Sequence, residues 1–393
     1  MNIVLLEWGG GEGNPFAYFN SELKLRLEDF GCNVYIVDIE GELAQKLYLL
    51  DTEKGIHRVI THQGFGSKIR LKSNGKLIWD ELKINLICLH SDHPSQAPSN
   101  HLPDSKYILH TYPFQSYVDY SNSMVEREYP AVLLSPPSFY KPNKKLFERK
   151  GDYFVFPKNI DPLQKTYAEW KSTLPSPVWA LLNETADAII DNYKNGDPIT
   201  HHELIDQLLT HEKLEEFKNF IHSKNPDDFR FFVLQNMDKI YRNAASELVL
   251  EELNDIPLHI NGRGWDMFVE KSSKYHKFSS FNELAKGDKQ FYSNFGIIDI
   301  VPFKHSLHDR TLRAISHQCG FLSNSGILFY DSNGMPYSSL FFNGFKGSLR
   351  AKAEVVINSP DEHYDRCQQF GIDLELRNPF DKFFEFLYSN ISH

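Results

Sequence analysis

The chain has 393 residues, with 42 Lys and Arg against 52 Asp and Glu, a formal charge of −10, and 41% hydrophobic residues. This composition is typical of a folded globular protein and excludes a largely disordered or fibrous chain. The acidic balance argues against a general nucleic-acid-binding protein, which carries a basic surplus, so an anionic ligand would need a local cluster of basic side chains.

The length predicts two or three domains, with two preferred, since about 150 residues per domain is usual. The start "MNIVLLEWGG" lacks the basic residues and cleavage site of a signal peptide, and no run of about 18 apolar residues follows anywhere. We therefore expect a cytoplasmic protein without a transmembrane segment. Peripheral association with a membrane surface is an alternative that the sequence leaves open. The cysteines form no CxxC pair, which favours reduced structural thiols over disulfides or a zinc site: Cys32, Cys88, Cys319 and Cys367.

The first domain is expected over residues 1–150. Residues 2–8 form an apolar run, a glycine-rich stretch follows, residues 15–31 carry apolar side chains at helical spacing, and residues 32–41 are again strand-like. Strand, glycine loop, helix and strand are the opening of a parallel α/β domain. Further strands are predicted in residues 57–64, 84–94, 106–112 and 130–138.

A Pro-rich and Lys-rich segment, residues 135–150, is the predicted linker. The second domain is expected over residues 151–377, with a helical insert over about 163–255. Its strands are predicted in residues 152–159, 256–265, 295–302 and 321–325, and a helix in residues 308–320. Residues 378–393 contain an amphipathic helix that is expected to cross back to the first domain. The fold class predicted is α/β, with two Rossmann-like domains facing across a cleft.

The stretch "KHSLHDRTLRAISHQCG" gathers positive charge where a helix is predicted to begin. Free backbone N–H groups and the helix dipole make such a helix start suitable for phosphate. Arg310 can bind two phosphate oxygens at once, and His308 can add a hydrogen bond. Lys304, His305 and Asp309 belong to the same candidate site, and Arg313 lies one turn further on. The alternative for these residues is an ordinary solvated basic face, or an ion pair between Arg313 and a core carboxylate.

Several of these stretches resemble the CgeB-like, family-1-type glycosyltransferases of the GT-B fold. The resemblance rests on "LHINGRGW", on "IIDIVPFKHSLHDRTLRAISHQCGFLSNS" and on the strand end "LICLHSDHP". It implies transfer of a sugar from a nucleotide-activated donor to an acceptor hydroxyl, for example on a bacterial surface polysaccharide. No metal or other cofactor is expected, because such enzymes neutralise the departing phosphate with a helix start and basic side chains.

Three groups of residues at predicted strand ends complete the expected site. Asp92 and His93 are the candidates for deprotonating or positioning the acceptor hydroxyl, against a structural turn before Pro94. Donor-binding candidates at strand ends in the second domain are Lys158, Asn159, Gly262, Arg263 and Gly264, against plain tight turns with Trp265 in the core. Acceptor-side candidates are Glu7, Gly10, Gly11, Glu12 and Asn14.

One position departs from the family pattern. Many retaining members have a Glu three residues after the His-Asp-Arg arginine, to hold the donor ribose, and this chain has Arg313 there. A CMP-linked sugar acid is therefore one possible donor. A catalytically silent GT-B-like glycan- or nucleotide-binding protein and a nucleotide-sugar epimerase are the alternative functions.

Overall fold

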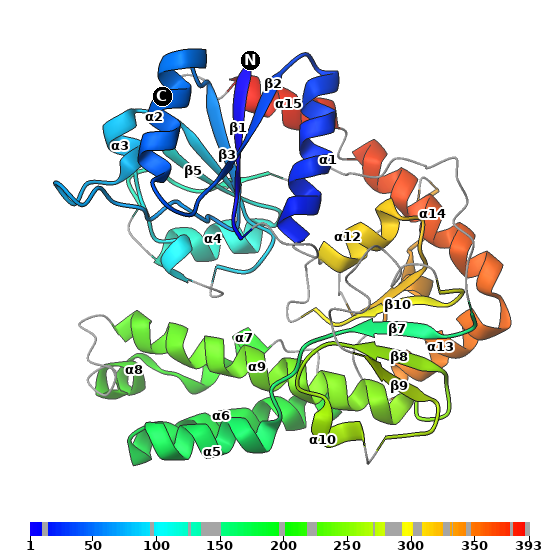
Figure 1. Ribbon diagram of the computed structural model, residues 1–393. Helices are drawn as coiled ribbons and strands as arrows, with labels where there is room; N and C mark the ends of the chain where they lie inside the picture. Colours follow the sequence, from blue (N-terminus) through cyan, green and yellow to red (C-terminus); the bar gives the residue numbers. More distant parts are fainter. Residues whose placement is uncertain are drawn as a thin grey trace. The chain divides into compact units, whose positions relative to one another are not determined.

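The computed structural model divides into two compact units (Figure 1). The first consists of Met1–Tyr140 together with Ile372–His393, and the second of Lys141–Gly371. The division between Tyr140 and Lys141 falls inside the segment expected as linker. The structure describes residues 1–9, 15–94, 98–124, 127–134, 151–195, 201–217, 226–269, 272–279, 293–301, 309–324, 331, 333–342, 347–377 and 380–389.

The first unit is built on a six-stranded sheet in the order β2-β1-β3-β4-β5-β6, and every neighbouring pair is parallel. Its strands are β1 (Asn2–Glu7), β2 (Asn33–Asp38), β3 (Arg58–His62), β4 (Leu86–Leu89), β5 (Ile108–Tyr112) and β6 (Val132–Leu133). All six lie in stretches predicted as strands. The chain reverses direction across the sheet between β1 and β3, so the carboxyl ends of these two strands flank the crevice where open α/β sheets usually bind ligands.

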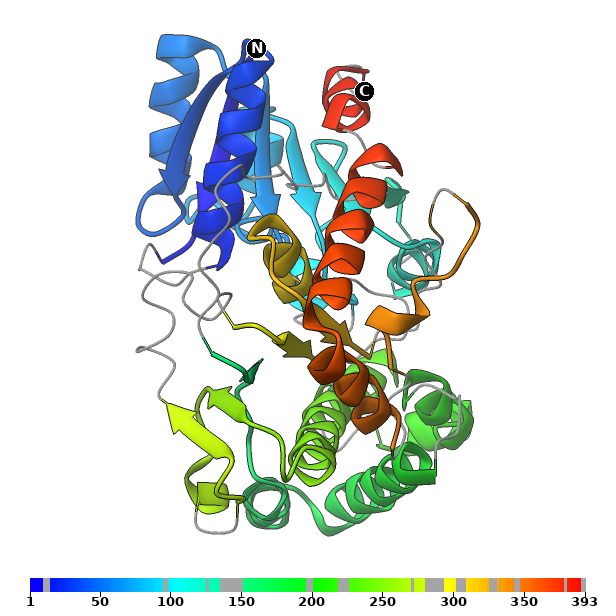
Figure 2. The same cartoon turned by 90° about the vertical axis from the view of Figure 1, so that its right-hand side faces the viewer.

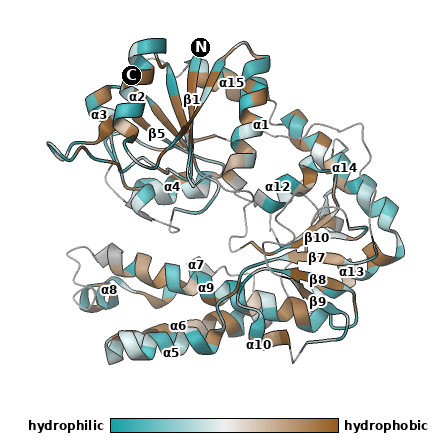
Figure 3. Cartoon of the chain, viewed as in Figure 1, coloured by the Kyte–Doolittle hydropathy of each residue, from teal (hydrophilic) through white to brown (hydrophobic). Residues whose placement is uncertain are grey.

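Helices cover both faces of this sheet, which explains the nearly continuous apolar strands, brown in Figure 3. The helices are α1 (Pro15–Asp29), α2 (Leu43–Lys54), α3 (Ile78–Leu82), the short 3-10 turn η1 (Pro98–Asn100) and α4 (Gln115–Met124). Successive side chains of β1 point to opposite faces of the sheet: Ile3 and Leu5 pack in one core cluster, and Val4 and Leu6 in the other.

The C-terminal helix α15 (Phe380–Ser389) belongs to the first unit. Its buried side chains Phe380, Phe383 and Leu387 follow helical spacing and pack in the same cluster as Ile3 and Leu5. The last residues of the sequence therefore complete a core that the first residues begin.

The second unit has a five-stranded parallel sheet in the order β11-β10-β7-β8-β9. The strands are β7 (Phe154–Pro157), β8 (Leu258–Asn261), β9 (His276–Ser279), β10 (Gly296–Asp299) and β11 (Phe321–Ser323). The first strand in the chain is central, two follow on one side, and two more on the other, which is the order of a Rossmann half. Here the reversal lies between β7 and β10.

Among the described residues between β7 and β8 there are five helices: α5 (Leu163–Thr173), α6 (Ser176–Asn195), α7 (His201–Leu208), α8 (His211–Phe217) and α9 (Pro226–Glu252). Figures 1 and 2 show α6 and α9 side by side in the green part of the chain, and they are in contact. Val249 and Leu253 at the end of α9 pack with Phe154 and Phe156 of β7, so the long helix is anchored in the core of the sheet.

The other described helices that begin in this unit are α10 (Asp266–Val269), α12 (Asp309–Ser316), the 3-10 turn η4 (Ser338–Leu340), α13 (Ser348–Asn358) and α14 (Pro360–Arg377). The last residues of α14, from Ile372 on, are assigned to the first unit. Leu349, Ala353 and Val356 of α13 join the cluster that includes Phe154. On the opposite face the rings of Phe321 and Phe370 meet edge to face at 5.5 Å.

The prediction of an α/β protein with two parallel-sheet domains is confirmed. The strand β9 was not predicted, because its sequence His-Lys-Phe-Ser lacks an apolar run. Among the described helices, none combines the length and apolar composition needed to cross a membrane.

Candidate functional site

The candidate site of the second unit lies where β7 and β10 end side by side. Lys158 directly follows β7, and its side chain is only 4% exposed. Its Nζ donates a hydrogen bond of 3.0 Å to the carbonyl oxygen of Ile300, the residue after β10. An ammonium group can donate up to three hydrogen bonds, and this one lies at the point where the sheet reverses.

The carboxylate of Asp299 ties the start of α12 to the end of β10. Thr311 donates from Oγ1 to Oδ2 of Asp299 at 2.9 Å, and Nη1 of Arg310 lies 3.4 Å from Oδ1. The Asp299 side chain is fully enclosed, whereas that of Arg310 is 27% exposed. One edge of the guanidinium is thus held by the strand end, while part of the group remains accessible. Neither Asp299 nor Thr311 was predicted from the sequence to belong to the site.

The glycines of "NGRGW" are required by contact between two loops of the chain. A Cβ on Gly262 would lie 1.9 Å from the carbonyl oxygen of Lys158, and one on Gly264 would lie 1.9 Å from that of Ile160. Trp265, which packs in the core, donates from Nε1 to the same Lys158 oxygen at 2.7 Å. Packing between the two loops is therefore enough to explain why both positions are glycine. Close approach of a ligand to these glycines stays a prediction.

Asn159 and Arg263 take part in the same contact between the loops. The backbone N–H of Arg263 donates to Oδ1 of Asn159 at 2.9 Å, and the N–H of Ile160 donates to the carbonyl of Arg263 at 3.0 Å. The Asn159 side chain thus has a structural role at the carboxyl edge of the sheet.

Asn261, the last residue of β8, is a site candidate that the sequence did not reveal. It is 0% exposed, yet neither its Oδ1 nor its Nδ2 has a hydrogen-bond partner among the described residues. Buried amides are almost always satisfied, so these two atoms are available to a bound molecule. Asn261 pairs with Pro157 in the sheet, next to Lys158. It lies within "LHINGRGW", of which only the three residues after it were predicted to bind the donor.

Part of the predicted phosphate site lies outside the described residues. This applies to Lys304, His305 and His308 and to the side chain of Asp309, although α12 does begin at Asp309. Arg313 is located one turn along α12, where its carbonyl oxygen accepts a hydrogen bond of 2.8 Å from Nδ1 of His317.

In the first unit, the predicted catalytic pair separates into a packed imidazole and a more accessible carboxylate. His93 is 7% exposed, and its ring lies 4.9 Å from that of Tyr117 and 4.4 Å from that of Tyr120. Asp92 is half-buried, and its backbone N–H donates to Oε1 of Gln63 at 3.4 Å. Asp92 is therefore the better placed of the two to act as a base.

Aromatic rings surround the ends of β1 and β3, where this sheet reverses. Trp8, which follows the half-buried Glu7, stacks on Phe65 with ring centroids 5.1 Å apart. Phe16 stacks on His62 at 5.8 Å. The Nε2 of His62 is enclosed without a hydrogen bond to a described residue, and burial lowers the pKa of this imidazole to about 4. The remaining acceptor-side candidates Gly10, Gly11, Glu12 and Asn14 lie outside the described residues.

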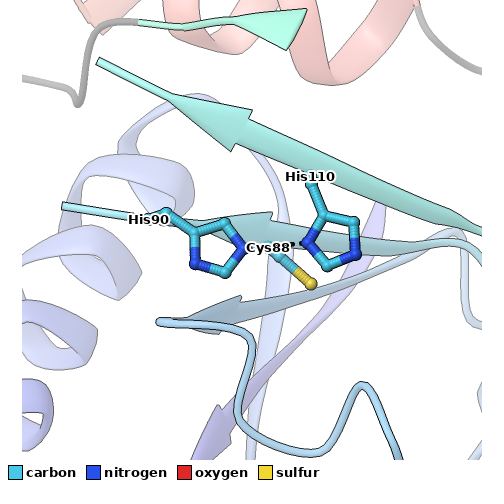
Figure 4. A group of neighbouring side chains, drawn as sticks. All are labelled: Cys88, His90 and His110. Atoms are coloured by element: carbon cyan, nitrogen blue, oxygen red, sulfur yellow. Dashed lines mark hydrogen bonds between the residues drawn. The ribbon is translucent and has the colours of Figure 1, made fainter. Parts of the chain in front are cut away.

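Within the part of the chain that the structure describes, one group of side chains has the composition and spacing of a metal-binding site: Cys88, His90 and His110 (Figure 4). All three are buried in the first unit. Cys88 lies on β4 and His110 on β5, so sheet pairing brings together residues that are distant in sequence.

The sequence matches no known family model, and no curated protein sequence is significantly similar to it.

Proposed function

We propose that the chain is a glycosyltransferase of GT-B type, which moves a sugar from a nucleotide-activated donor to an acceptor hydroxyl. The donor phosphates would bind at the carboxyl edge of the second unit's sheet, between β7 and β10. One observation carries the proposal: Lys158, Arg310 and the start of α12 lie around the same reversal point of a Rossmann-ordered sheet.

The chemistry of transfer matches these groups. As the bond to the sugar breaks, negative charge develops on the departing phosphate, and preorganised donors at that place stabilise the transition state. The exposed part of the Arg310 guanidinium can bind phosphate oxygens as a fork, since Asp299 takes only one edge of it. The first N–H groups of the eight-residue helix α12 add partial positive charge. A metal is not required in this scheme.

The acceptor would bind to the first unit, with Asp92 as the base that removes the proton of its hydroxyl. A carboxylate at the end of β4 suits this role, because it remains partly accessible while Gln63 fixes the neighbouring backbone. In the GT-B arrangement two such units bring donor and acceptor together, and this arrangement is part of the proposal.

The donor is tested by thermal unfolding of the full chain with UDP-, GDP-, TDP-, ADP- and CMP-linked sugars. A ligand that binds only the folded state raises the melting temperature, because at free concentration L it stabilises that state by RT ln(1 + L/Kd). We expect one nucleotide class to raise it, and the CMP-linked sugar acid tests whether Arg313 serves a carboxylated donor. No shift with any member of the panel would contradict the proposal.

A catalytically silent nucleotide-binding protein is the second candidate. The ion pair between Arg310 and Asp299 favours this candidate, because it already engages part of the guanidinium that is proposed to bind the donor phosphate. The transferase and the silent protein are distinguished by incubating the chain with the nucleotide-sugar that raises its melting temperature, with and without simple saccharide acceptors. Release of nucleotide supports the enzyme, whereas a thermal shift without any turnover supports the silent protein.

A further inference from the structure

The three side chains Cys88, His90 and His110 converge from two rigid neighbouring strands. Cys88 pairs with His110 in the register of β4 and β5, and His90 lies two residues after Cys88, so all three lie on one face of the sheet (Figure 4). Their potential ligand atoms all lie within 4.8 Å of one another. Because the positions are fixed by sheet pairing, the group needs no rearrangement of the backbone to gather around one ion.

Hydrogen bonds fix which nitrogen of each imidazole has a free lone pair. Nε2 of His110 lies 2.9 Å from the carbonyl oxygen of Pro103, which can only accept, so this nitrogen carries the proton. With the proton on Nε2, the neutral ring, which is the form of imidazole that binds metals, has its lone pair on Nδ1. That Nδ1 faces Nε2 of His90 at 2.9 Å.

Without a bound ion, the polar atoms of Cys88, His90 and His110 do not all have hydrogen-bond partners among the described residues. His90 must donate from Nε2 to His110, which leaves a bare lone pair on His90 Nδ1, and that atom has no partner among the described residues. The thiol of Cys88 makes no hydrogen bond within the same described part of the chain, although it is fully buried. Donation of His110 Nε2–H to a backbone carbonyl is also the outer contact that typically orients a metal-bound histidine.

We propose that Cys88, His90 and His110 bind one thiophilic metal ion through Sγ, Nε2 and Nδ1. In the bound state the ion takes the place of the proton between the two imidazoles. That proton moves to Nδ1 of His90, so that both rings stay neutral, and Cys88 releases its thiol proton to solvent as it becomes a thiolate. A thiolate with two imidazoles suits Cu⁺ and Zn²⁺, since both accept soft sulfur and nitrogen ligands. The ion would join β4 to β5 and would stabilise the first unit.

Charge distinguishes the two ions. The ligands supply one negative charge, and two described groups affect both His90 and His110 electrostatically, the imidazole of His101 and the cation of Arg127. Cu⁺ leaves the ligand set neutral, whereas Zn²⁺ leaves it with one positive charge near the half-buried guanidinium of Arg127. The site is therefore expected to bind Cu⁺ more tightly than Zn²⁺.

The site is tested with the full chain after chelator treatment, by titration with Zn²⁺, with Cu⁺ under anaerobic conditions, and with Co²⁺ as a reporter. We expect about one equivalent of metal per chain, a raised melting temperature, and a thiolate-to-cobalt charge-transfer absorption. Cys88→Ala and His110→Gln should weaken binding about 100-fold or more, since even outer-shell changes cost about 10- to 100-fold.

Cys367→Ala is the matched control. Cys367 is a buried cysteine of the second unit whose Sγ lies 3.6 Å from Nε2 of His363, so it presents a thiol beside one imidazole, and its replacement should leave binding unchanged. The wild-type cobalt spectrum reports thiolate coordination even if a variant fails to fold. Binding of less than about one tenth of an equivalent of every ion by the wild type, or a charge-transfer band that persists in folded Cys88→Ala, would overturn the proposal. This result is independent of the proposed glycosyl transfer.

Discussion

Thr311 on α12 donates a hydrogen bond of 2.9 Å from Oγ1 to the carboxylate of Asp299 at the end of β10, and both side chains are enclosed. This bond holds the first turn of the helix at the edge of the sheet and, with it, the neighbouring Arg310. The geometry of the proposed donor site thus depends on a strand-to-helix contact that involves no ligand.

Thr311→Val should lower the free energy of unfolding by about 1–3 kcal/mol, because it removes the hydroxyl that donates to a buried carboxylate. Thr311→Ser retains the hydroxyl and should cost about 1 kcal/mol or less for the lost methyl group. Urea unfolding of the two variants measures the difference. Equal stability of the valine and serine variants would show that the bond contributes nothing.

Gly264→Ala should destabilise the second unit more strongly than Gly347→Ala. Both glycines have positive φ, at +91° and +84°, so each alanine costs about 1–2 kcal/mol of backbone strain. Only the Cβ at position 264 meets backbone, 1.9 Å from the Ile160 oxygen, whereas the one at position 347 has nothing within 4 Å. We expect the clash to add at least about 2 kcal/mol in urea unfolding. A similar loss for both variants would mean that the two loops separate easily.

The stability of the first unit should decrease in acid through His62. Its pKa is about 4 in the folded chain because of burial, against an ordinary value near 6.5. Between these values the unfolded chain binds a proton at this side chain and the folded chain does not, so the contribution is complete above about pH 6.5 and is lost as the pH falls toward 4. The full difference is about 3 kcal/mol.

His62→Phe keeps a ring beside Phe16 and removes the titrating group. The free energy of unfolding is measured at pH 7 and pH 4.5 for wild type and variant, so that all other titrating groups cancel. The wild type should lose more stability over this interval than the variant. Identical losses would show that His62 is protonated without cost.

The C-terminal helix should be essential to the first core. Phe383 is almost completely buried, and Phe383→Ala should cost about 3–5 kcal/mol. Tyr388 on the same helix is 64% exposed, and Tyr388→Ala should change stability by no more than about 0.5 kcal/mol. Thermal unfolding compares the two. A neutral Phe383→Ala would contradict the packing of α15 on the sheet.

The sequence predicts the sheets well because their strands are apolar on both faces and are followed by Gly, Pro or polar residues. The helix that begins at Asp309 is likewise predicted from its charged start and apolar spacing. The strand β9 was missed, because His276 and Lys277 break the apolar pattern and its place is set by pairing with β8.

The sites are harder to predict, because they depend on which residues the sheet brings together. Cys88 and His110 lie 22 positions apart and face one another only through the register of β4 and β5. The amide of Asn261, which has no hydrogen-bond partner among the described residues, and the ion pair between Asp299 and Arg310 also depend on strand order, which local sequence does not specify.

The most direct test of the proposed donor site is the affinity of the Arg310→Ala chain for the nucleotide-sugar that stabilises the wild type. Loss of the guanidinium should weaken binding about 10- to 100-fold, and Arg310→Lys should lie between, since it keeps the charge and loses the fork. Arg230→Ala, which removes an arginine paired with Asp206 on the helical insert, is the control and should bind as the wild type does. Calorimetric titration of folded Arg310→Ala that gives the wild-type affinity would contradict the assignment of the donor phosphates to this edge of the sheet.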